Sequence, residues 1–216
     1  MTDRRTKEAL RYLGYGTHAA DERTLELVRD CFRDLETYAS AKSVCRIFDC
    51  VPAGPESLRI GKMEIHSRSL GKNLAGCEKA AVFGATLGTG VDRLMRTASL
   101  TDMARAVGYQ ACAAALLEEY CDEIQRKLEK EAGEEGLWVR PRFSPGYGDF
   151  DIRHQRDILE MLDAPKVIGL SMTDGYMLTP VKSVTALAGL SRVKADCHIH
   201  GCEECEKTDC AYRRSP

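Results

Sequence analysis

The residues with the clearest capacity for chemistry are four cysteines that lie within fourteen residues near the C-terminus. They are Cys197, Cys202, Cys205 and Cys210, with the spacing C-x4-C-x2-C-x4-C. Two residues between a pair of thiolates let both bind one centre, and four thiolates suit either zinc or an iron–sulfur cluster. His198 and His200 are further candidate ligands or neighbours of the metal. The spacing predicts a metal site but does not distinguish zinc from an iron–sulfur cluster. Zinc would stabilise the structure of the tail, whereas a cluster would accept electrons for transfer. Free thiols are the alternative.

A second candidate site is the stretch RPRFSPGYGDFD, residues 140–151. Its two prolines stiffen the backbone, and its two glycines let another molecule approach the main chain. Arg140 and Arg142 offer paired N–H groups to a carboxylate, while Tyr147 stands between the glycines and can project its ring. The composition excludes a helix or a regular strand. It favours a pre-shaped surface for a small zwitterionic, partly aromatic ligand, with a rigid connector as the alternative.

The bulk composition is that of an ordinary globular protein, with 44% hydrophobic and 30% charged residues. The 31 Lys and Arg against 33 Asp and Glu give a net charge of −2, which provides no basic surface for nucleic acid. The N-terminus lacks a secretory apolar segment, and no run of residues is long enough to span a membrane. We therefore expect a cytoplasmic protein without nucleic-acid or membrane partners. The six cysteines outside the tail are expected to be reduced and mostly buried.

Helical and strand-like patterns alternate along the chain without a regular βαβ rhythm. Asp21 is expected to open a helix, and the longest apolar stripe predicts a helix from Thr101 to about Ala132. Residues 43–50, 57–70 and 182–191 read as strands, with a bulge or tight turn at Gly61–Lys62, and residues 166–180 read as a strand–turn–strand. The pattern predicts an α+β fold: a single compact domain with a mainly antiparallel, twisted sheet flanked by helices, and a short Cys-rich tail. The expected division is residues 1–192 for the domain and 193–216 for the tail.

The segment FGATLGTG, between a strand and a helix, invites comparison with phosphate-binding loops. It lacks both G-x-G-x-x-G and G-K-[ST]. A tight strand-to-helix turn is the favoured interpretation.

Several segments resemble the activation (reactivation) domain of cobalamin-dependent methionine synthase, in its short stand-alone form. RFSPGYG (142–148) resembles the R-x-x-P-G-Y signature of that family, and P-x-K-S-V-T occurs at residues 180–185. EALRYLGYG, ATLGTGVDRLM and the Cys-rich ending are similar as well. The resemblance extends from about Thr6 to Arg214.

The resemblance implies a protein that binds S-adenosyl-L-methionine and supports reductive methylation of cob(II)alamin, within methionine biosynthesis. Arg142 would bind the ligand carboxylate, Ser144 and Gly146 would contact it through their main chain, and Pro145 and Tyr147 would complete the site. The chain is expected to be one component of a methyltransferase system, without an acid–base side chain of its own. An electron would come from a flavodoxin or another donor.

Three departures from the family pattern are visible in the sequence. If Glu119–Tyr120 matches the family's Glu–Tyr pair, the acidic contact of the long helix falls near Ala115. A tyrosine near the last strand is replaced by about Asp196–Cys197. The sequence has no cobalamin-binding module, so the resemblance implies a separate cobalamin-binding partner. The alternative function is a zinc or iron–sulfur accessory that docks on a corrinoid protein and passes electrons without S-adenosylmethionine.

Overall fold

The structure, a computed structural model, describes residues 3–16, 18–54 and 56–194. The described chain forms two compact units, and each is discontinuous in sequence. A helical unit draws on residues up to 40 and on residues 87–121, and a sheet unit draws on residues 41–86 and 122–194. No helix of the described ranges is both long enough and apolar enough to cross a membrane.

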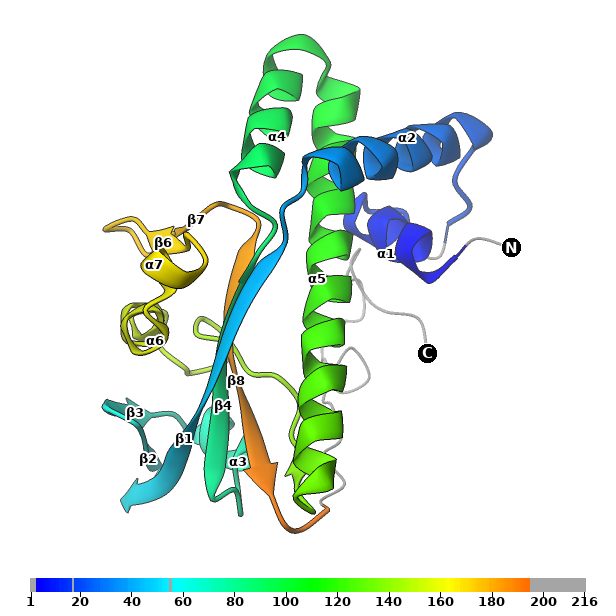
Figure 1. Cartoon of the computed structure of the whole chain (residues 1–216). Helices are drawn as coiled ribbons and strands as arrows, with labels where there is room; N and C mark the ends of the chain where they lie inside the picture. The colour runs from blue at the N-terminus through cyan, green and yellow to red at the C-terminus, as the bar shows by residue number, and fades with distance from the viewer. Residues whose placement is uncertain (1–2, 17, 55, 195–216) are drawn as a thin grey trace. The chain divides into compact units, whose positions relative to one another are not determined.

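The helical unit is built from four helices (Figure 1). They are α1 (Arg4–Tyr12), α2 (Glu22–Tyr38), α4 (Thr89–Thr101) and the first part of α5 (Met103–Glu134). Asp3 and Asp21 cap α1 and α2, because each carboxylate accepts a hydrogen bond from a backbone N–H three residues later. The predicted helix start at Asp21 and the predicted long helix are confirmed.

The core of the helical unit is made of small and branched side chains from all four helices. Its largest members include Phe32, Leu35, Leu87, Met95 and Tyr109. Arg5 adds an ion pair to Glu36 of α2 at 2.6 Å and another to Glu119 of α5 at 2.7 Å. Met103 and Val107, which belong to the apolar stripe that predicts this helix, are 67% and 52% exposed. The helix turns Ala106 and Tyr109 inward in their place.

The sheet unit contains a six-stranded antiparallel sheet in the order β3-β2-β1-β4-β8-β5. Its strands are β1 (Lys42–Gly54), β2 (Ser57–Ile60), β3 (Met63–His66), β4 (Lys79–Thr86), β5 (Trp138–Val139) and β8 (Ser183–Ser191). The predicted α+β class with an antiparallel sheet is confirmed. The predicted boundary between residues 192 and 193 stays a prediction.

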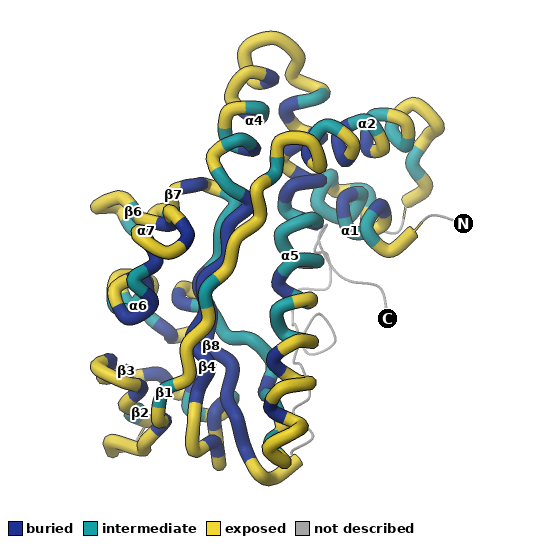
Figure 2. The backbone as a smooth tube through the Cα atoms, in the orientation of Figure 1, coloured by how far each residue is buried: buried dark blue, intermediate teal, exposed yellow. Residues whose placement is uncertain are grey.

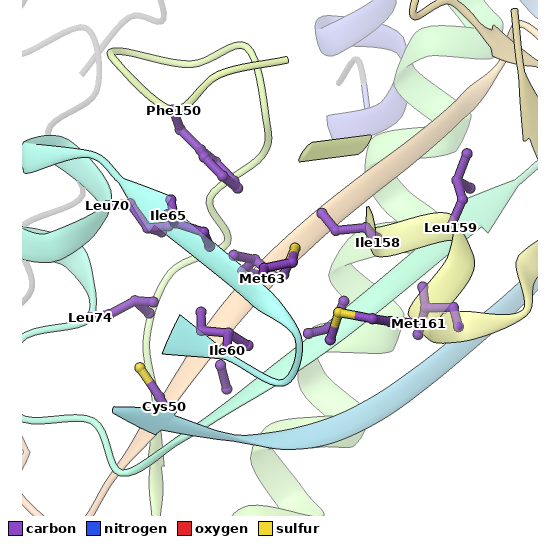
Figure 3. Packing of buried hydrophobic residues seen from close by; sticks show 14 of the residues in the cluster. Cys50, Ile60, Met63, Ile65, Leu70, Leu74, Phe150, Ile158, Leu159 and Met161 are labelled. Atoms are coloured by element: carbon purple, nitrogen blue, oxygen red, sulfur yellow. The ribbon is translucent and has the colours of Figure 1, made fainter. Parts of the chain in front are cut away.

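Both faces of the sheet are covered at β4 and β8, which are buried along almost their whole length, whereas β1 is largely exposed (Figure 2). Ala80 and Val82 of β4 face the larger core, where β2, β3 and the short helices α3 (Arg68–Asn73), α6 (His154–Leu162) and α7 (Ala164–Val167) pack. Figure 3 shows this core, with Met63 and Ile65 of β3 near Ile158 and Phe150. Ala81 points the other way, toward Leu128 and Ala132 of α5.

Two predicted segments of the sheet unit differ in the structure. The strands predicted over residues 57–70 form a β2–β3 hairpin with its turn at Gly61–Lys62, as predicted, but the second strand ends at His66. The Ser67 side chain accepts a hydrogen bond from Leu70 N and starts the helix α3. The strand–turn–strand begins later than predicted, at β6 (Ser171–Met172), which pairs with β7 (Leu178–Thr179). Pro165 lies in the first turn of α7, where its missing N–H costs nothing.

The Gly-rich segment after β4 is a tight turn, as favoured from the sequence. Gly88 is the N-cap of α4 and has a φ of +85°, a conformation that glycine adopts without strain. A Cβ at Gly90 would lie 2.2 Å from the carbonyl oxygen of Tyr38. Close packing of two backbones therefore explains these glycines.

All six described cysteines are free thiols, as expected from their isolated positions. Cys31, Cys50, Cys77, Cys112 and Cys121 are buried. Desolvation raises the pKa of the buried Cys50 thiol to about 11. These cysteines thus behave as small apolar residues.

Candidate functional site

The stretch 140–151 forms an irregular loop, as its composition predicts, and it is attached to the sheet at its first half. Arg140 N donates to Gly189 O at 2.8 Å. Phe143 N donates to Leu187 O at 2.8 Å, and Leu187 N donates back to Phe143 O at 2.9 Å. These three bonds place the start of the loop beside β8, a central strand of the sheet.

Arg142 points from the loop to the long helix α5. Its Nη2 donates to Asp122 Oδ1 at 2.9 Å, and its Nη1 donates to Gln125 Oε1 at 3.2 Å. The side chains of Arg142 and Asp122 are 20% and 31% exposed, so the ion pair is neither fully solvated nor sealed from a ligand. The pair puts a guanidinium and a carboxylate side by side at the edge of the loop.

The next four residues, Ser144–Tyr147, form a turn that displays main chain and one aromatic ring. Tyr147 N donates to Ser144 O at 3.2 Å, and Gly146 N donates to Phe150 O at 2.7 Å. Gly146 has a φ of +91°, and Pro145 is buried beneath it. Tyr147 is 68% exposed, as expected for a ring that projects between two glycines.

Two aspartates follow the turn, and each is held by different donors. Asp149 accepts hydrogen bonds from Ser67 Oγ at 2.6 Å, Arg68 N at 2.7 Å and Ser69 N at 3.0 Å, all at the start of α3. The Ser67 hydroxyl and the two N–H groups hold the pKa of Asp149 well below its usual range. Asp151 accepts from Arg153 N and Arg153 Nε, both at 2.8 Å, which lowers the pKa of Asp151 to about 2. Both groups are therefore carboxylates at neutral pH.

Three other loop residues have structural roles, and one of them, Arg140, is buried and does not offer its guanidinium to a ligand as expected. Arg140 is 4% exposed, and its Nη2 donates to Ala75 O at 3.3 Å. Phe150 is 1% exposed and stacks on His154, with ring centroids 5.4 Å apart. Phe143 packs against the same core at the side of Phe150. Of Arg140 and Arg142, Arg142 is thus the one whose side chain is partly exposed.

The position that the resemblance assigned to an acidic contact, Ala115, is buried in the core of the helical unit. The carboxylate that accompanies Arg142 is Asp122, seven residues later along the same helix. Seven residues correspond to about two turns, so the two positions share one face of α5. Sequence reasoning missed the pairing of Asp122 with Arg142, because no local pattern indicates it.

The predicted metal ligands Cys197, Cys202, Cys205 and Cys210 lie outside the described residues, as does the Asp196–Cys197 position. Within the described ranges, no group of three or more His, Cys, Asp or Glu side chains is arranged to hold a metal ion. The choice between zinc, an iron–sulfur cluster and free thiols thus stays a prediction.

Comparison with solved structures shows which known fold this chain shares. Among solved structures, the same architecture is found in a reactivation domain. That structure is described as the MetH reactivation domain bound to AdoHcy. It matches this chain with a TM-score of 0.63 and 16% sequence identity, over 82% of this chain and 67% of that chain. The two proteins therefore share a fold. No protein-family model matches the sequence, and no curated protein is found to be similar to it.

Proposed function

We propose that this protein is a reactivation factor for a cobalamin-dependent methyltransferase, of which methionine synthase is the simplest case. The observation that carries the proposal is the loop that presents Arg142 and the Ser144–Tyr147 turn on a fold shared with a reactivation domain. The ligand of that domain, AdoHcy, supports S-adenosylmethionine as the ligand of this chain.

The charges at the loop fit the amino-acid end of S-adenosylmethionine. A zwitterion carries a carboxylate and an ammonium on one carbon, and Arg142 and Asp122 hold the complementary charges 2.9 Å apart. In the bound state, Arg142 would hold the carboxylate and Asp122 would face the ammonium. The main chain of Ser144 and Gly146 and the ring of Tyr147 would hold the nucleoside end.

The methyl transfer itself needs no acid or base from this chain. The sulfonium supplies an activated methyl group, and the corrinoid of the partner accepts it. One electron from a donor such as flavodoxin and one S-adenosylmethionine convert cob(II)alamin into methylcobalamin and S-adenosylhomocysteine. The residues described here would contribute position, which is the main requirement when both reactants are already activated.

A reconstitution assay tests the proposal directly. The protein is mixed with S-adenosylmethionine, a reductant and a cob(II)alamin-loaded methionine synthase that lacks its own activation domain. We expect methylcobalamin to form only when this protein is present. Failure to form methylcobalamin, together with no heat of binding between this protein and S-adenosylmethionine, would reject the proposed function.

The role of Asp122 can be tested separately by calorimetry. We expect Asp122→Asn to weaken S-adenosylmethionine binding about tenfold, because the variant loses the charge that faces the ammonium. Binding of methylthioadenosine, which lacks the amino-acid end, should be unchanged.

The matched control is Glu123→Gln, which removes one exposed negative charge from the next position of the same helix. This control should bind both ligands as the wild type does. Tighter binding of S-adenosylmethionine by Asp122→Asn would show instead that Asp122 competes with the ligand for Arg142.

A further inference from the structure

The exit of the ligand loop is docked on α3, a helix that precedes it by about eighty residues in the chain. The Asp149 carboxylate accepts from the Ser67 hydroxyl and from the N–H groups of Arg68 and Ser69. Ser67 in turn accepts from Leu70 N at 3.0 Å, as an N-cap does. Since N–H groups in the first turn have no partner within the helix, Asp149 supplies acceptors that α3 lacks. A charged acceptor also makes these bonds stronger than neutral ones.

Gly148 lets this docking take place. Its φ is +54°, and a Cβ at this position would lie 2.9 Å from Ser69 Oγ and 3.1 Å from Ser69 Cβ. Both distances are shorter than ordinary van der Waals contact. A side chain at position 148 would therefore push the loop away from α3 and stretch the bonds that Asp149 makes.

The segment between the two attachments is the one that we propose for the ligand. Upstream, Phe143 is bonded to Leu187. Downstream, Asp149 is bonded to α3 and Phe150 is buried. The span in between contains two glycines with positive φ, which restrict the backbone least of all residues. The turn also has backbone bonds of its own, because Gly146 N donates to Phe150 O at 2.7 Å and Phe150 N donates to Tyr147 O at 3.0 Å. Those bonds close the turn on itself, whereas the bonds of Asp149 fix the closed turn to α3.

We propose that Asp149 is a positioning residue: by bonding the start of α3, it holds the Ser144–Tyr147 turn in the shape that the ligand requires. This inference rests on the proposed function, because the turn is taken as the ligand-binding segment. It adds a residue outside that segment and assigns part of the site's preorganisation to α3.

The test compares Asp149→Asn with Asp151→Asn. Both variants remove one carboxylate from the same loop. The Asp151 carboxylate, however, accepts its hydrogen bonds from Arg153, two residues away, and so does not attach the loop to α3. At a temperature where both variants are fully folded by circular dichroism, we expect Asp149→Asn to raise the S-adenosylmethionine dissociation constant about tenfold. Asp151→Asn should change it less than about twofold.

A second pair of variants separates positioning from general destabilisation. Gly148→Ala keeps the Asp149 carboxylate but adds the Cβ that meets Ser69, so its affinity should fall as well. Gly136→Ala is the control, because Gly136 has a similar φ of +72° but nothing within 4 Å of an added Cβ. It should lose stability through backbone strain and keep the wild-type affinity.

Amide hydrogen exchange measures how firmly the loop is held when no ligand is bound. Asp149→Asn should speed exchange at Ser69 and Gly146 relative to Asp151→Asn. If the wild type binds S-adenosylmethionine and Asp149→Asn binds it equally well, the inference is wrong and the proposed function stands. If the wild type does not bind, the proposed function fails. Exchange then decides the inference: faster exchange at Gly146 supports a loop held by Asp149, and unchanged exchange overturns it.

Discussion

Arg142→Ala is expected to weaken S-adenosylmethionine binding by about 100-fold or more and to abolish methylcobalamin formation at modest ligand concentrations. Truncating one member of a hydrogen-bonded, largely desolvated charge pair costs roughly 2–5 kcal/mol of binding free energy. Arg142 would be one member of such a pair in the complex, and its side chain is already only 20% exposed. Calorimetry and the reconstitution assay measure the two effects.

Two further variants make this prediction specific. Arg142→Lys keeps the charge but loses the planar fork, so its affinity should lie between those of the alanine variant and the wild type. Arg153→Ala removes an exposed arginine that pairs with Asp151 in the same loop, and it should bind like the wild type. Wild-type affinity of Arg142→Ala would mean that Arg142 serves only to link the loop to Asp122.

Gly90→Ala is expected to produce the largest loss of stability in the helical unit, about 3 kcal/mol in the free energy of unfolding. The added Cβ would lie 2.2 Å from the Tyr38 carbonyl oxygen, a backbone atom at the end of α2. The backbone nearby is itself bonded, since Ser40 N donates to Leu87 O at 2.9 Å, so neither chain can yield without breaking other contacts. Urea denaturation followed by circular dichroism measures the change.

Gly133→Ala is the matched control for this substitution. Gly133 lies in the last part of α5, and an added Cβ there would meet nothing within 4 Å. Alanine favours a helix over glycine by about 0.8–1 kcal/mol, so this variant should be slightly more stable than the wild type. Equal stability of the two variants would mean that the close approach at Gly90 is relieved by a small shift.

Local patterns predicted the elements that depend on local physics. Asp21 marks the start of α2 because an aspartate caps the N–H of a residue three positions later. The long helix α5 follows from its apolar spacing, and the irregular loop follows from its prolines and glycines. The exposure of Met103 and Val107 was missed, because apolar periodicity identifies a face without showing what covers each turn of it.

The contacts that shape the site depend on distant parts of the chain. Arg142 meets Asp122, twenty residues before it, and Asp149 meets Ser67, eighty-two residues before it. Local sequence propensities cannot predict either contact, since each contact depends on how β8 and α3 are placed in the folded sheet unit. A motif can therefore name Arg142 and Tyr147 as candidates, whereas Asp122 and Asp149 become visible only in three dimensions.

The discontinuity of the sheet unit has a practical consequence for dissecting the protein genetically. The unit ends its first part at residue 86 and resumes at residue 122, and the intervening segment belongs to the helical unit. A truncation from either terminus therefore cannot separate the ligand loop and its whole sheet from residues 87–121. Deleting the N-terminal half would remove β1 and β4 and leave β8 without its long antiparallel neighbour. Only a deletion of 87–121 bridged by a new linker, or two fragments that reassemble, would isolate the loop-bearing unit.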